Sequence, residues 1–187
     1  HVAYSNLLDA YEQLARYELD RGQSPEAWIE KAQETGERSL QVNPNYYQTH
    51  RNLASIMVLR AEFESASGRR PHAALAQALA NAEQATRANS DDAETHRLLA
   101  HIHWLDARER VQQRQDARAP LSRGLAAIEK SIRVSPNNAD SYLVQLRLLL
   151  LAAPGDAAPR TILDQARQAA QHDAATDRHL HLDLAVE

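Results

Sequence analysis

The chain has 187 residues, no cysteine and a formal net charge of −4. Without cysteine it can form no disulfide and use no thiol chemistry, which fits a reducing compartment and leads us to expect a cytoplasmic location. The slightly negative charge gives no electrostatic reason to expect a nucleic-acid partner, and no apolar run approaches the roughly 20 residues that span a bilayer, so we expect no membrane partner either.

The sequence repeats itself with a step of 46 residues, which takes residue 4 to residue 50. Internal self-similarity at such a period is the signature of repeat architectures. The register predicts four units at about 1–46, 47–92, 93–138 and 139–173. The step aligns the pairs Asn6 and Asn52, Leu7 and Leu53, Gly22 and Gly68, Pro25 and Pro71, Leu53 and Leu99, and His96 and Tyr142.

Each unit is predicted to form two helices joined by a short turn. In the first unit the first helix carries apolar residues at helical spacing and ends near Gly22. The second helix opens at Ser24-Pro25-Glu26, where we expect Ser24 to cap the helix ahead of the proline, and it ends near Asn43-Pro44. Connections this short make consecutive helices pack antiparallel. The apolar residues of the first helix are Leu7, Leu8, Tyr11 and Leu14.

The fourth unit is abbreviated. We expect its turn at residues 153–156 and its second helix to open at Pro159. An amphipathic segment at about 174–187 is expected to form a helix that covers the last exposed face, as arrays of this kind require. The prediction is an all-α array of about nine antiparallel helices without strands. Because the chain opens at His1 and enters the repeat almost at once, we interpret it as a fragment of a larger protein.

The pattern resembles the tetratricopeptide repeat, a helix–turn–helix unit of 34 residues. An aromatic residue, leucine, a small residue and tyrosine mark its first helix, and small residues and a proline mark its second. This chain departs from the family in having 12 more residues per unit, which would lengthen each helix by roughly 9 Å. The resemblance implies a right-handed α-α superhelix. The matching residues are Tyr4, Leu7, Leu8, Tyr11, Ala32, Ser39, Pro44, Gly124, Ser131 and Pro136.

The elongated units and their turns also resemble the repeat tails that follow bacterial serine/threonine kinase domains. No kinase signature occurs in this sequence, and neither does a phosphate loop, a HExxH motif or a Ser/His/Asp motif. We therefore expect no enzymatic activity and no cofactor.

The nine histidines do not form a recognised metal-ligand pattern. His101 and His103 are two residues apart on a predicted helix and so point to different faces. His96 and His103 fall at packing positions of the repeat. The group His172, His179 and His181 has no zinc-ligand spacing, so we expect no metal site.

The first helix of each unit offers candidate partner-binding residues. In the tetratricopeptide family, positions 5 and 9 line the concave groove, and residues four apart share a helix face. Arginines recurring at these positions would suit carboxylates or phosphates. Alternatively, they pair with neighbouring Glu and Asp residues. Only Asn52 matches the positions that grip chaperone tails, so we do not expect that partner. The predicted binding residues are Arg51, Asn52, Ser55, Arg97, His101 and Arg147.

Two functions remain open at this point. The first is a non-catalytic scaffold that docks proteins or peptides, which we expect to be the interaction module of a larger bacterial signalling protein and to bind acidic segments. The second is a regulatory or self-associating segment that contacts its own catalytic domain or another copy. Exposure of the leucine run at residues 148–151 would favour self-association, whereas burial of that helix on several sides is what we expect.

Overall fold

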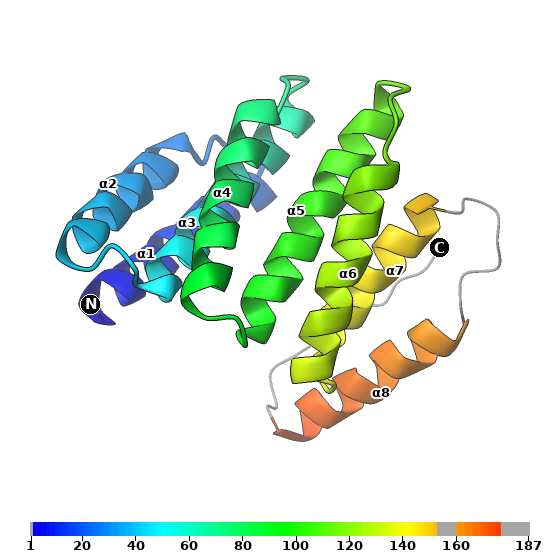
Figure 1. Cartoon of the computed structure of the whole chain (residues 1–187). Helices are drawn as coiled ribbons and strands as arrows, with labels where there is room; N and C mark the ends of the chain where they lie inside the picture. The colour runs from blue at the N-terminus through cyan, green and yellow to red at the C-terminus, as the bar shows by residue number, and fades with distance from the viewer. Residues whose placement is uncertain (1, 153–159, 177–187) are drawn as a thin grey trace.

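The computed structural model describes residues 2–152 and 160–176, and all regular secondary structure in those residues is helical (Figure 1). The all-α prediction is confirmed for this part of the chain. The predicted turn at 153–156 lies outside it. The predicted last helix also lies outside the described residues, except for residues 174–176, which form the end of α8. The helices are α1 (Val2–Asp20), α2 (Glu26–Val42), α3 (Tyr47–Ala66), α4 (His72–Ala88), α5 (Ala93–Gln112), α6 (Arg118–Val134), α7 (Ala139–Ala152) and α8 (Arg160–Thr176).

The helices contact only near neighbours along the chain. Each described helix packs against the next one, and α1, α3, α5 and α7 also pack against one another in succession. The helices α2, α4 and α6 do not contact one another, and the first pair does not touch the fourth. The odd-numbered helices therefore form one layer that is continuous from α1 to α7. Packing limited to neighbouring units is typical of repeat proteins.

The first helix of each complete pair has 19 or 20 residues, and the second has 17. Their core consists of aliphatic side chains such as Leu8, Ile56 and Ile102, which are almost completely buried. Where helices cross, small residues allow close approach: a Cβ atom at Gly124 would lie 2.7 Å from Leu148 Cδ2. The other small residues that the repeat pattern singled out, Ala32, Ser39 and Ser131, are also buried.

One hydrogen bond recurs at the start of α3, α5 and α7. His50 Nε2 donates to the carbonyl oxygen of Pro44, and His96 Nε2 donates to that of Ser90, both at 2.8 Å. In α7 the hydroxyl of Tyr142 donates to the carbonyl oxygen of Pro136, also at 2.8 Å. These bonds tie each new pair to the turn that precedes it. Burial of His96 confirms its predicted packing role.

The turn within each pair closes in the left-handed backbone region. Gly22 and Gly68 both have φ of 70°, and Arg114, one repeat later, has φ of 58°. The next amide donates to the carbonyl five residues earlier in all three turns, as in Gln115 N to Arg110 O at 2.8 Å. The predicted cap at Ser24 is confirmed only in part: Pro25 occupies the N-cap position of α2, but Ser24 Oγ accepts a hydrogen bond from the backbone amide of Glu26 at 3.5 Å.

Part of the apolar pattern of α1 is exposed. Leu8 is fully buried, but Leu7 and Leu14 are 41% and 39% exposed. One repeat later Leu53 packs against Gly36 of α2, because α3 has a preceding helix pair to cover it, and no described helix covers this face of α1. In α7, Leu148 is fully buried while Leu150 is 45% exposed, so the expected burial of the leucine run holds for only part of it.

The strained turn residue gives a stability prediction. Arg114→Gly should raise the free energy of unfolding by about 0.5–1 kcal/mol, because glycine adopts positive φ without the steric cost that a side chain incurs. Urea denaturation followed by circular dichroism measures this. As a control, Arg123→Gly within α6 should lower stability by about 1 kcal/mol. Equal destabilisation by both changes would mean that residue 114 is not held in the left-handed region.

Candidate functional site

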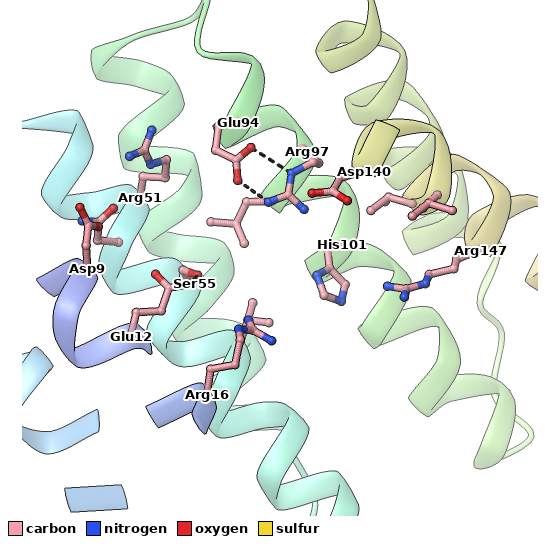
Figure 2. Close-up of a pocket in the computed structure, with 15 residues that line it drawn as sticks. Asp9, Glu12, Arg16, Arg51, Ser55, Glu94, Arg97, His101, Asp140 and Arg147 are labelled. Carbon is pink, nitrogen blue, oxygen red and sulfur yellow. Dashed lines mark hydrogen bonds and ion pairs between the residues drawn. The ribbon is translucent and has the colours of Figure 1, made fainter. Parts of the chain in front are cut away.

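A cavity of about 410 Å³ opens on the layer formed by α1, α3, α5 and α7 (Figure 2). All six residues predicted to bind a partner line it, so the structure brings them together on one surface. The remaining lining residues are Asp9, Glu12, Arg16, Val58, Glu94, Leu98, Asp140, Leu143 and Val144.

Helix direction explains why these residues meet. Asn52 bonds to Asp9 and Ser55 bonds to Glu12, and both pairs are 43 residues apart. A constant separation means that α1 and α3 run parallel, so equivalent residues stack side by side. Along each helix, steps of three and four residues keep side chains on the same face.

Two predicted residues hold the helices together. Asn52 Nδ2 donates to Asp9 Oδ1 at 2.6 Å, and Ser55 Oγ donates to Glu12 Oε1 at 2.6 Å. Burial raises the pKa of the Glu12 carboxyl, and the hydrogen bond from Ser55 only partly offsets this. Glu12 is therefore a carboxylate whose charge is poorly solvated, and a cation placed beside it would be stabilised.

The arginines differ in their partners. Arg97 binds both carboxylate oxygens of Glu94, with Nε 2.9 Å from Oε2. Burial tends to lower the pKa of Arg97, but Glu94 outweighs this effect and the pKa is raised. Arg51 lies 3.6 Å from Asp92. Of the two alternatives that the sequence left open, pairing with neighbouring Glu and Asp residues is therefore the one found at these two positions.

Arg147 is placed differently. In the described part of the chain it has no carboxylate at ion-pair distance, and its Cζ lies 5.3 Å from the centroid of the Trp104 ring. A guanidinium at this distance from an indole is attracted by the negative face of the ring. In Figure 2 the side chain of Arg147 extends from α7 toward His101.

His101 is a neutral group in the groove wall. Burial, aided by the charges of Arg147, Arg97 and Arg16, lowers its pKa to about 3. Its Nε2 atom is buried and 3.6 Å from Glu62 Oε1, too far for a hydrogen bond, and a neutral imidazole forms no ion pair. As predicted, His101 and His103 face different sides: His103 is buried, and its Cβ lies 3.2 Å from where a Cβ at Gly124 would be.

Sequence reasoning missed much of the groove. Glu12 and Arg16 lie three and seven residues after Asp9, on the face of α1 that lines the cavity. Glu62 and Arg108, the residues equivalent to Arg16 in the next two units, do not line the cavity; Glu62 Oε1 lies 3.6 Å from His101 Nε2, and the charge of Arg108 helps to lower the pKa of His101. Extending the groove positions by a further helical turn in the 46-residue register would have found them.

No protein-family profile matches this chain, and no curated protein sequence matches it. Among the described residues, no three His, Asp or Glu side chains lie close enough together to bind a metal ion. Nor does any helix in residues 2–152 and 160–176 have the length and apolar character needed to span a bilayer.

The neutral histidine predicts a pH dependence of stability. The unfolded chain protonates residue 101 below its ordinary pKa of 6.5, whereas the folded chain resists protonation until about pH 3. The contribution of residue 101 to the free energy of unfolding is therefore fully present above pH 6.5 and is lost as the pH falls below that value. The unfolding free energy of the unmodified chain should fall more steeply than that of His101→Gln, by at most about 1.4 kcal/mol per pH unit. Parallel curves between pH 7 and 4 would show that His101 takes up protons freely.

Proposed function

We propose that the chain is a non-catalytic docking scaffold that binds an extended polypeptide segment in the groove across α1, α3, α5 and α7. The single observation that supports this is the polar cavity that four alternate helices, α1, α3, α5 and α7, line together. In this proposal the helix pairs form a right-handed superhelix like that of tetratricopeptide proteins, and the chain is the interaction module of a larger bacterial signalling protein in the cytoplasm.

The dimensions suit a peptide. The cavity volume falls within the range of about 300–1,000 Å³ that ligand sites occupy. Packed helices lie about 8–10 Å apart, so four helices offer a path of about 24–30 Å. An extended chain advances about 3.3 Å per residue, so seven to nine residues would cross all four helices.

The polar lining also suits a polypeptide rather than a reaction. An extended peptide carries an amide donor and a carbonyl acceptor at every residue and needs polar partners for them. Ser55 supplies the one hydroxyl among the lining residues, and it is held by Glu12 in a hydrogen bond that fixes α1 to α3. The carboxylates and arginines serve largely as partners for one another.

The charges that line the cavity limit which segments the groove would select. Four carboxylates and four arginines line the cavity, so its net charge is close to zero. The expectation that the groove selects acidic segments along its whole length therefore loses its electrostatic basis. Charge complementarity between the groove and a ligand therefore has to come from separate parts of the groove.

A second candidate function is self-association or contact with another domain of the same protein. The observation that favours it is the apolar stripe of α1, where Leu7, Leu14 and Tyr17 are 41%, 39% and 55% exposed. In α3 and α5 the corresponding face is covered by the preceding pair. A helix from another copy could cover it in α1.

Selection of a random twelve-residue peptide library on the chain tests the proposed function. Enriched peptides should bind with micromolar affinity or better, and Leu143→Arg, which fills the groove, should weaken them by at least about tenfold. Arg97→Glu should do the same while circular dichroism shows unchanged helicity. Gln77→Arg, on the exposed face of α4, is the matched control.

Peptides that bind Leu143→Arg as well as the unmodified chain would show that the groove is not the binding site. If binding were instead lost in a variant with Leu7→Glu and Leu14→Glu, and sedimentation showed that the unmodified chain dimerises, self-association through α1 would replace the groove proposal.

A further inference from the structure

Charge is unevenly distributed along the groove. Because its helices run parallel, residues near the N-terminal ends of α3, α5 and α7 share one end of it. At this end four carboxylates face two arginines, Arg51 and Arg97, both of which already have carboxylate partners. Asp140 is exposed and has no ion-pair partner among the described residues. The excess charge at this acidic end is therefore negative. The four carboxylates are Asp9, Glu12, Glu94 and Asp140.

The other end of the groove has an excess of positive charge. Arg16 and Arg147 line it, and Arg108 lies behind it with Cζ 4.8 Å from the Trp104 ring that Arg147 also contacts. Burial raises the pKa of Glu62, and the charges of the three arginines oppose that rise, which shows that all three act on one place. Three guanidinium groups thus act on Glu62 at this basic end, and Asp20 is a second carboxylate whose charge acts there.

These arginines have unused binding capacity. Within residues 2–152 and 160–176, none of the three has a carboxylate at ion-pair distance, and Arg108 Nε is buried without a hydrogen-bond partner. Figure 2 shows Arg16 and Arg147 entering the cavity from different helices, with His101 in the wall beside Arg147. Like charges held together repel one another, so an anion bound among them would be stabilised.

We propose that the groove binds a dipolar segment: an anionic oxygen group at the basic end, and a lysine or arginine side chain at the acidic end. This inference rests on the proposed peptide-binding function. Asp140 and Arg147 are seven residues apart on α7, a rise of about 10.5 Å. Where the bound segment runs along α7, three residues of an extended peptide cover about the same distance, so the two charges of the ligand should be three positions apart.

The anionic group is a phosphorylated side chain or a carboxylate. A phosphate monoester carries about −1.5 to −2 charges, which complements the excess positive charge of the basic end, and guanidinium groups bind its oxygens bidentately. A different role for the same charges is to complement the helix dipoles, since negative groups near N-termini stabilise helices. That role would affect thermal stability and leave ligand affinity unchanged.

Fluorescence anisotropy with synthetic peptides tests the proposal. The probe is an acetylated, amidated and fluorescein-labelled alanine-rich peptide with lysine and phosphoserine three positions apart, made in both orders because the chain direction is not fixed. The better order should bind at least about tenfold tighter than peptides with serine for phosphoserine or alanine for lysine. Glutamate in place of phosphoserine tells whether a carboxylate suffices, and competition by inorganic phosphate tells whether the free anion binds alone.

Two exposed residues provide matched variants. Arg147→Gln should remove the advantage of phosphoserine and keep that of lysine, and Asp140→Asn should do the reverse. Arg133→Gln, exposed on α6, is the control and should change neither.

The proposal is overturned if both variants weaken every peptide equally, or if they shift only the melting temperature. If library-selected peptides occupy the groove but carry no such pair of charges, this inference fails while the proposed function stands. If no peptide binds in the groove at all, both fail.

Discussion

The structure depends on how each helix pair is fixed to the one before it. A side chain in the first turn of α3, α5 and α7 donates to a carbonyl six residues earlier, at the turn that ends the preceding pair. Histidine does this twice and tyrosine once, so the requirement is a flat side chain with a donor at its tip. Because this bond orients each new pair in the same way, α1, α3, α5 and α7 stay side by side, and their shared face becomes a groove.

The length of the odd-numbered helices affects the chemistry of that groove. In α1, α3 and α5 the helix continues past the predicted groove positions to Arg16, Glu62 and Arg108, which are one repeat apart from one another. Charged groups are costly to bury unless they are paired, and here Glu94 with Arg97 and Asp92 with Arg51 meet that cost. Burial that no partner fully offsets raises the pKa of Glu12 and of Glu62 and lowers the pKa of His101.

Much of this was predictable from the sequence, and the reasons for the exceptions are physical. The 46-residue step predicted the helix pairs, and two positions per unit predicted the groove residues Arg51, Arg97, His101 and Arg147. The step did not reveal that side chains meet at a separation of 43 residues, since adjacent helices are displaced along their axes, and so it missed Asp9 as the partner of Asn52. Arg114 was missed because positive φ is not expected of arginine.

The central claim is that the face shared by α1, α3, α5 and α7 receives a polypeptide. Amide chemical-shift mapping tests it most directly, in a titration of the ¹⁵N-labelled chain with a library-selected peptide. The account predicts that the largest shifts fall on the lining residues of the odd-numbered helices, from Asp9 to Arg147, and that α2, α4 and α6 change little. Shifts concentrated around Leu7, Leu14 and Tyr17 on the opposite edge of α1, with the groove unchanged, would contradict it.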